Sequence, residues 1–144
     1  MRIWPLAFGL REVEFCGFVV TADGIKSHPD KLKSIRKWPE PQNVQEARAF
    51  FGLAGLYQRF VKNFAYIVHP ISGLFKKTAK WSWKNEQQKA FANLKQGLME
   101  STALAYPDLN KEFVLHVDAS ADALGATLSQ EDRVGQLRLI TCTS

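Results

Sequence analysis

The sequence predicts an α+β protein, in which a mainly helical lobe is followed by three antiparallel strands of an incomplete second domain. Apolar side chains recur at helical spacing through residues 29–99, whereas β-branched and alternating patterns fill residues 112–141. Charge divides the chain in a similar way. Residues 26–80 carry 11 basic and 3 acidic side chains, and residues 101–144 carry 3 basic and 6 acidic ones. A basic lobe of this kind favours a polyanionic partner.

Composition excludes several classes of protein. The 144 residues are 46% hydrophobic and 23% charged, which suits a packed core in one domain or two small lobes. No apolar run approaches the roughly 18 residues of a transmembrane helix, so we expect no membrane partner. Cys16 and Cys142 have no CxxC or histidine partner, so neither a zinc site nor a disulfide framework is indicated. We expect a reduced, intracellular protein of the cytoplasm or nucleus.

The first elements are a strand and a short helix. Residues 13–20 are rich in β-branched and aromatic side chains and run into a turn signal at residues 22–24, which predicts one strand closing in a turn. Pro29 occupies a first helical position, and Pro39 with Pro41 stops the helix that follows. The apolar residues of this helix are Leu32, Ile35 and Trp38.

The longest predicted helix covers residues 43–64. Asn43 is a good N-cap, and Glu46 completes a capping-box arrangement three residues later. The apolar stripe continues for about twenty residues at spacings of three and four. It comprises Ala47, Phe50, Phe51, Ala54, Tyr57, Val61 and Phe64.

Two further helices are predicted before the composition changes. Pro70 begins a short helix that ends on Lys76 and Lys77, cations that suit a helix C-terminus. A second helix spans residues 85–99, with Lys84 in its capping position. Lysine is a poor N-cap because its side chain offers no acceptor to the first free amides.

Three strands are predicted near the end of the sequence, at residues 112–118, 124–129 and 137–141. A turn at residues 121–122 and a hairpin loop at residues 131–135 connect them. A three-stranded sheet with one apolar face normally requires a helix over it. We therefore expect that the chain carries only part of this domain.

The sharpest candidate for function is a stripe on the second face of the predicted long helix. Its members fall at i, i+4, i+7, i+11 and i+14 and are Arg48, Gly52, Gly55, Arg59 and Lys62. Glycine inside a helix costs about 1 kcal/mol relative to alanine. Two glycines flanked by cations would let a phosphate backbone approach the helix closely. A solvated basic face, with the glycines serving helix packing, is the alternative that the pattern leaves open.

Asp118 is the second candidate, because a carboxylate at the end of a strand is well placed for a divalent metal such as Mg²⁺. A turn-capping role is the alternative reading. Two-metal phosphodiester chemistry needs several carboxylates, and no spacing brings Asp122, Glu131 or Asp132 to Asp118. The three histidines, His28, His69 and His116, are scattered and show no metal-binding spacing.

Recognisable segments follow one another along the chain at residues 15–20, 24–26, 29–32, 35–41, 48–54, 57–64, 70–74, 117–120 and 125–130. Through them, from residue 8 to residue 144, the sequence resembles the reverse transcriptase of gypsy-type LTR retrotransposons. The segments occur in the family's order. The resemblance is therefore to a long stretch of the polyprotein and does not depend on one motif.

The resemblance implies three regions. Residues 1–25 would be the end of a palm strand and its turn, residues 26–100 the helical thumb and connection, and residues 101–144 the start of an RNase H-like domain. It implies that the helix at residues 43–64 tracks the template and primer, so that nucleic acid, as an RNA/DNA hybrid or a duplex, binds Arg48, Gly52, Gly55, Arg59 and Lys62. It also implies that Asp118 is the first RNase H carboxylate and a ligand of the parent family's Mg²⁺.

The resemblance also bounds the expected activity. The parent family is an RNA-directed DNA polymerase and hybrid nuclease, but its paired polymerase aspartates and its remaining RNase H carboxylates have no counterpart in these 144 residues. We expect template–primer binding without catalysis and without a tightly bound metal ion. Gln58 stands where the family favours arginine, which removes a cation from the binding region. The alternative is a domesticated or neutral interaction module that binds a protein partner at the open sheet edge.

Overall fold

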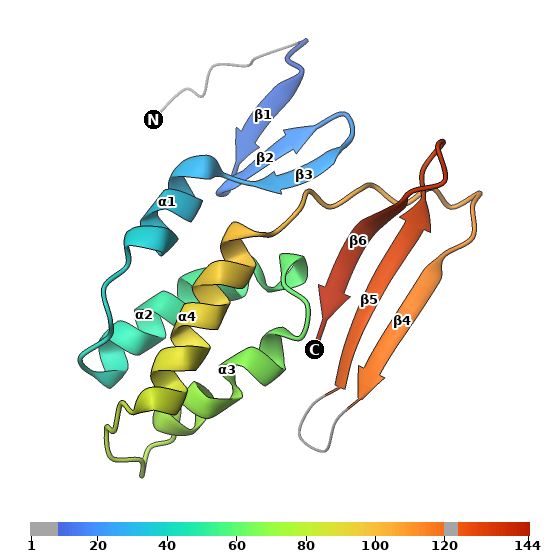
Figure 1. Ribbon diagram of the computed structural model, residues 1–144. Helices are drawn as coiled ribbons and strands as arrows, with labels where there is room; N and C mark the ends of the chain where they lie inside the picture. Colours follow the sequence, from blue (N-terminus) through green and yellow to red (C-terminus); the bar gives the residue numbers. More distant parts are fainter. Residues whose placement is uncertain (1–8, 120–123) are drawn as a thin grey trace.

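The computed structural model describes residues 9–119 and 124–144 and confirms the α+β prediction (Figure 1). The helices are α1 (Pro29–Lys37), α2 (Val44–Leu56), α3 (Phe64–Ser72) and α4 (Asn85–Met99), with short 3₁₀ helices η1 (Gln58–Phe60) and η2 (Gly73–Phe75). The first sheet contains β1 (Glu12–Phe15), β2 (Phe18–Thr21) and β3 (Gly24–Ser27), and the second contains β4 (Val114–Ala119), β5 (Leu124–Glu131) and β6 (Leu137–Thr143).

The single strand predicted at residues 13–20 is wrong, because this segment folds back on itself as the β1–β2 hairpin. Cys16 and Gly17 form the turn with φ values of 50° and 83°. Positive φ at both central positions is the geometry whose twist matches two antiparallel strands, and glycine adopts it without steric cost. The β-rich composition predicts strand structure correctly, but it does not reveal the turn at Cys16 and Gly17.

Side-chain hydrogen bonds mark the starts of α2 and α4. The Asn43 side chain accepts a hydrogen bond from the Glu46 amide over 2.9 Å, and the Glu46 carboxylate accepts one from the Gln42 amide over 2.8 Å. These contacts confirm the N-cap predicted for α2. At α4, Lys84 provides no side-chain cap, and the Gln87 side chain instead accepts from the Lys84 amide over 3.0 Å.

The single helix predicted over residues 43–64 is also wrong, because α2 ends at Leu56. The chain tightens into η1, and Asn63 then adopts a left-handed conformation with φ of 54° before α3 begins. Aromatic and β-branched residues, which are weak helix formers, make up half of residues 57–64. Asparagine tolerates the left-handed region better than most residues, so the break falls where it costs little.

The core lies where the four helices meet. The Phe50 ring packs 4.6 Å from the Phe91 ring and 5.8 Å from the Trp38 ring, centroid to centroid. Burying an aliphatic or phenyl side chain completely contributes roughly 1.5–3 kcal/mol. The fully or almost fully buried members are Ile35, Phe50, Ala54, Tyr57, Ile71, Leu94 and Leu98. This core fixes the α2 surface and the loops at its ends.

The second sheet has the order β4-β5-β6 and contains the three predicted strands. A bulge between Leu128 and Ser129 shifts the pairing of β5 with β6. Buried Gln130 ties the sheet to the segment before it: its amide nitrogen donates to the Asp108 carbonyl over 2.9 Å, and its oxygen accepts from the Asp108 amide over 2.8 Å. The turn predicted at residues 121–122 lies outside the described residues.

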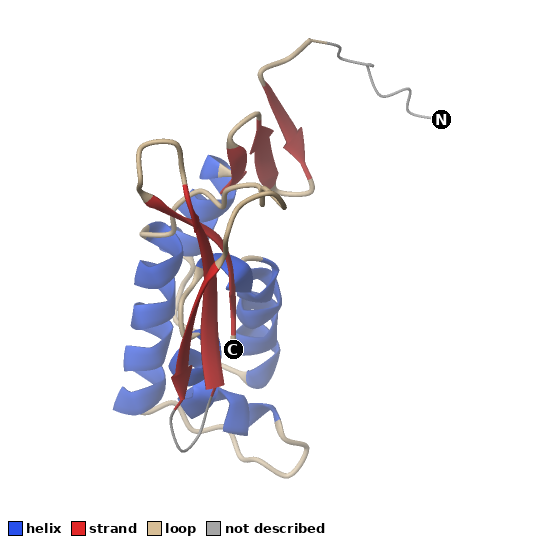
Figure 2. Cartoon of the chain, turned by 90° about the vertical axis from the view of Figure 1, so that its right-hand side faces the viewer, coloured by secondary structure: helices blue, strands red, loops and turns tan. Residues whose placement is uncertain are grey.

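The segment after α4 hydrogen-bonds to both sheets. Ile25 of β3 and Leu104 exchange two backbone hydrogen bonds of 2.8 Å, and the amide of Ala105 donates to the Leu139 carbonyl of β6 over 2.7 Å. Figure 2 shows the β4–β6 sheet in front of the helices and the smaller sheet beyond one of its ends. The two sheets are therefore joined through the backbone of residues 104 and 105.

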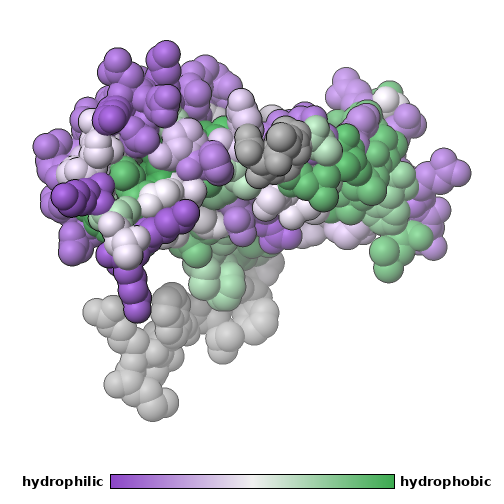
Figure 3. Space-filling view, turned by 90° about the horizontal axis from the view of Figure 1, so that it is seen from below, coloured by the Kyte–Doolittle hydropathy of each residue, from purple (hydrophilic) through white to green (hydrophobic). Residues whose placement is uncertain are grey.

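One face of the second sheet is turned toward the helices, and the other is apolar and exposed. Leu115, Val117 and Leu124 of the outer face retain 61%, 60% and 62% of their accessible surface. Alternation along β4 places His116 and Asp118 on the opposite, inner face. Figure 3 shows hydrophobic residues gathered at the sheet end of the molecule and hydrophilic ones at the helical end.

Candidate nucleic-acid surface and carboxylate cleft

Helix α2 presents two glycines on its accessible side. A Cβ atom built at Gly52 or at Gly55 would meet no atom within 4 Å outside the local backbone, so neither glycine serves close packing in this chain. The finding excludes a packing role for the glycines among the described residues, and a solvated basic face is still the alternative to a binding surface. Without side chains, the two glycines leave the helix backbone open to close approach.

Arg48 lies on the same helix and is fixed by the loop beside it. Its guanidinium donates a hydrogen bond to the Phe75 carbonyl over 2.9 Å, and the side chain remains exposed. This contact satisfies one donor of the five that the guanidinium carries. Arg48 can therefore meet a phosphate while one of its donors holds it in place.

The helix break separates Lys62 from the stripe on α2. Arg59 lies in η1, and with Gly55 it lines a pocket of about 410 Å³ that residues 141–144 at the end of β6 also line. Lys62 follows η1 and lines a second, larger cleft. The predicted residues therefore form two groups, with Arg48, Gly52, Gly55 and Arg59 toward α2 and Lys62 toward the sheet.

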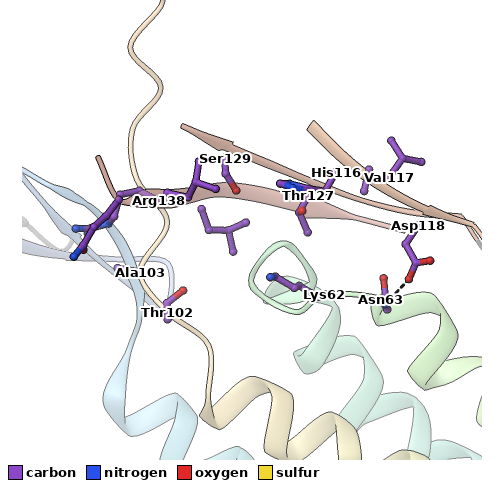
Figure 4. A pocket seen from close by; sticks show the side chains of 15 residues that line it. Lys62, Asn63, Thr102, Ala103, His116, Val117, Asp118, Thr127, Ser129 and Arg138 are labelled. Carbon is purple, nitrogen blue, oxygen red and sulfur yellow. Dashed lines mark hydrogen bonds between the residues drawn. The ribbon is translucent and has the colours of Figure 1, made fainter. Parts of the chain in front are cut away.

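Asp118 meets the helical lobe through Asn63. The Asn63 side-chain amide donates to the Asp118 carboxylate over 3.2 Å, as the dashed line in Figure 4 marks. Gly125 pairs with Asp118 in the sheet, and a Cβ there would lie 2.5 Å from the Asn63 side-chain oxygen. The missing side chain of Gly125 is what admits Asn63 to the carboxylate.

The cleft around this contact has a volume of about 780 Å³ and lies between the helical lobe and the sheet. Lys62 and Asn63 line it from the helical side, and Figure 4 shows them facing the strands that carry Thr127 and Asp118. Its polar lining also includes Thr102, His116, Ser129 and Arg138. Two permanent cations and several hydroxyl groups around one carboxylate suit an anionic ligand as well as they suit a cation.

The described residues do not supply a two-metal site. Within residues 9–119 and 124–144, no group of three histidine, cysteine or acidic side chains is close enough to hold an ion. Glu131 pairs at the far end of β5, and six residues of strand from Gly125 correspond to about 20 Å. Asp122 lies outside the described residues. With one carboxylate and one amide, no step of metal-dependent hydrolysis can be derived from this cleft.

Burial changes the pKa of two side chains near η1, Cys142 and Tyr57. Burial raises the pKa of the Cys142 thiol, and the nearby Lys62 ammonium partly opposes that shift. Burial also raises the pKa of Tyr57, whose hydroxyl donates to the Gly17 carbonyl over 2.8 Å. Both groups are neutral near pH 7, so neither adds a negative charge next to Arg59 or Lys62 there.

Sequence reasoning missed the part that the helical lobe takes in the Asp118 cleft. Asn63 and Asp118 are 55 positions apart, and no periodic pattern links them. The one local signal was an asparagine inside a predicted helix, where this residue is a weak helix former that favours turns and caps.

Among the described residues, no helix is long and apolar enough to cross a bilayer.

Comparison with known proteins identifies relatives for most of the chain. The family described as an RNase H-like domain found in reverse transcriptase matches residues 83–144. The Pol polyprotein of the gypsy transposon of Drosophila melanogaster is 41% identical over 138 residues, which is 88% of this chain and 13% of the polyprotein. The polyprotein of transposon 297 from the same fly is 45% identical over 121 residues, or 83% of this chain and 11% of that protein.

A solved structure shares the fold. The foamy viral protease-reverse transcriptase in complex with an RNA/DNA hybrid superposes with a TM-score of 0.73 at 24% identity, over 92% of this chain and 18% of that one. The likeness covers both the helical lobe and the second sheet. The chain thus spans about an eighth of the length of the polyproteins it matches.

Proposed function

Because this chain belongs to the reverse transcriptase/RNase H region of gypsy-type LTR retrotransposon polyproteins, we propose that its helical lobe binds a template–primer duplex. The observation that carries the proposal is the open surface over Gly52 and Gly55 on α2, with Arg48 at one end and Arg59 at the other. Phosphates of a duplex backbone would pair with the two guanidinium groups. The foamy viral relative in fold was solved with an RNA/DNA hybrid, which favours the same ligand class.

The proposal assigns a role to each region. Residues 1–25 would be the end of the palm, residues 26–100 the thumb and connection that hold the duplex, and residues 101–144 the start of an RNase H-like domain. Asp118 would be the first metal-ligating carboxylate of that domain, with Mg²⁺ as its ion. Because only one carboxylate lines the described cleft, we propose that these 144 residues bind nucleic acid without polymerising or hydrolysing it.

The test is fluorescence anisotropy of the 144-residue chain with a labelled RNA/DNA hybrid, titrated across salt after circular dichroism has shown that the chain is folded. Binding should weaken steeply with salt, and Arg59→Ala should lower the salt slope by about 0.9 for one lost phosphate contact. Lys37→Ala, in the last turn of α1, is the matched loss of one exposed cation outside the surface. A folded chain that does not bind, or equal slopes for both variants, would overturn the proposal.

The exposed outer face of the second sheet favours a second candidate, a contact with another protein. Leu115, Val117 and Leu124 expose about three fifths of their surface each, and β4 is an edge strand of the described sheet. Unpaired strand edges beside apolar faces are common sites of association. Sedimentation velocity of the purified chain against Leu115→Lys would detect such association, which the lysine should abolish if this face carries it.

A further inference from the structure

A second basic surface lies in the loop between η2 and α4, away from the glycines of α2. Residues 76–84, the basic loop, contain four lysines and no acidic residue. All four lysines, Lys76, Lys77, Lys80 and Lys84, are exposed, and none forms an ion pair with another part of the chain that the structure describes. A stretch of nine residues therefore carries a formal charge of +4 with no internal compensation.

The loop also carries a pair of stacked tryptophans. The Trp81 and Trp83 rings lie 5.5 Å apart, centroid to centroid, with an angle of 19° between their planes. Both are partly exposed. Trp83 is the anchored member, because its ring packs edge-on to the core residue Phe91 and its indole nitrogen donates to the Gln88 side chain over 2.8 Å. Trp81 stacks on this anchored ring and is itself partly exposed.

Both ends of the basic loop are fixed to the core. At the start, the Phe75 ring packs 5.5 Å from that of Phe51, and the Phe75 carbonyl accepts the hydrogen bond from Arg48. At the end, Trp83 packs on Phe91. Because both ends are held by core contacts, part of the cost of ordering the loop is met before a ligand binds. Figure 3 views the molecule from the side on which this loop lies in Figure 1.

We propose that the basic loop is a binding site for single-stranded nucleic acid, in which one base stacks on Trp81 while neighbouring phosphates pair with the lysines. Stacking requires an accessible π-face and tolerates any base, and the lysines supply the sequence-independent charge. A duplex hides its base faces within its own stack, so it could use only the lysines of this loop. The inference goes beyond the duplex surface of α2 and does not depend on it, since it uses different residues and a different form of nucleic acid.

The first test compares two labelled strands of equal length and charge. One is oligodeoxythymidylate, and the other is the same sugar–phosphate strand without its bases. The intact chain should bind the strand with bases more tightly, by about fivefold or more, because stacking of one base contributes roughly 1–3 kcal/mol. Trp81→Ala should bind both strands equally and weakly. Equal affinity of the intact chain for both strands would overturn the proposal.

Two control variants separate stacking from folding and from charge. Trp81→Phe keeps an aromatic face and should retain most of the preference for bases, whereas Tyr106→Ala removes an exposed aromatic ring elsewhere and should leave it unchanged. Lys77→Ala with Lys80→Ala should lower the salt slope on oligodeoxythymidylate by about 1.4, at about 0.7 per phosphate contact. An effect of Tyr106→Ala as large as that of Trp81→Ala would also overturn the site.

The two proposals fail independently. If Arg59→Ala loses hybrid binding but keeps single-strand binding, the two ligands use different surfaces. That result supports the basic loop as a single-strand site, whether or not its residues also contact a duplex. A chain that binds hybrids but shows no preference for bases would refute the basic loop and leave the α2 surface standing.

Discussion

Asn63 and Asp118 form a hydrogen bond of 3.2 Å that joins the helical lobe to the second sheet across 55 positions of sequence. Asn63 also occupies the left-handed N-cap position directly before α3. Asn63 therefore both allows the left-handed turn of the backbone and donates a hydrogen bond to the Asp118 carboxylate. Substitutions can separate these two roles.

Asn63→Gly should keep the left-handed turn and lose only the side-chain contact, whereas Asn63→Ala should lose both. A non-glycine residue other than asparagine or aspartate pays roughly 1–2 kcal/mol in this conformation. We expect Asn63→Ala to be less stable than Asn63→Gly by about 1 kcal/mol in urea denaturation followed by circular dichroism. Equal midpoints for the two variants would mean that the backbone conformation is not strained at this position.

Gly24 should be the least replaceable glycine in the described chain. Its φ is 153°, and a Cβ at this position would overlap the Leu104 carbonyl oxygen, which belongs to rigid backbone and accepts from Ile25. Gly24→Ala must therefore break the pairing of Ile25 with Leu104, and we expect a loss of about 2 kcal/mol or more, from two backbone hydrogen bonds. Thermal unfolding by circular dichroism measures it, and an unchanged melting temperature would contradict the geometry.

Gly52 should show opposite effects on stability and on binding. Gly52→Ala places a methyl group in open space within α2, so the helix should gain about 1 kcal/mol. Gly52→Leu should keep much of that gain, but its bulk should hold a duplex away from the helix and weaken hybrid binding. Urea denaturation of the same samples measures the gain in stability, and anisotropy measures the loss of affinity for the hybrid. A Leu variant that binds as tightly as the unaltered chain would show that nothing approaches the helix here.

The turn between β5 and β6 should make the chain sensitive to acid through Asp132. Backbone hydrogen bonds from Gln136 and Val134 hold the pKa of this carboxyl below its usual value of 3.8. A carboxyl with a lowered pKa stabilises the fold above the unfolded value and loses that contribution as the pH falls through the folded one.

We therefore expect the melting temperature to fall more steeply below about pH 4 in the unaltered chain than in Asp132→Asn. Asp23→Asn, in the turn between β2 and β3, is the control for losing one exposed carboxylate. Melting curves of the three proteins at pH 2.5 to 6, approximately, decide the matter. Parallel curves for the unaltered chain and Asp132→Asn would mean that the turn contributes nothing to acid sensitivity.

Local signals were sufficient to predict much of the fold. The capping pair of Asn43 and Glu46 located the start of α2, and strand-like segments separated by turn signals located all three strands of the second sheet. The break after Leu56 was not predictable from periodicity, because buried residues continue at helical spacing through Tyr57, Phe60 and Val61. A tertiary contact stabilises the break, because the Tyr57 hydroxyl donates a hydrogen bond to the Gly17 carbonyl, 40 positions earlier in the sequence.

The candidate site was predicted in part for the same reason. Arg48, Gly52 and Gly55 share one helix, so their common surface follows from spacing. The position of Lys62 in the Asp118 cleft follows from the packing of η1 against β6 and could not be inferred from a helical wheel. The assignment of these residues to nucleic acid, and of Asp118 to a metal, remains a prediction.

The backbone contacts of residues 104 and 105 bear on how the two lobes can move. Through them the strands run β1-β2-β3, then this short segment, then β6-β5-β4, as one nearly continuous hydrogen-bonded ribbon. β3 meets residue 104 at one bridge, and β6 meets residue 105 through one hydrogen bond. These contacts restrain hinge motion between residues 100 and 101, so under the proposed function duplex binding by the helices and the orientation of Asp118 should change together.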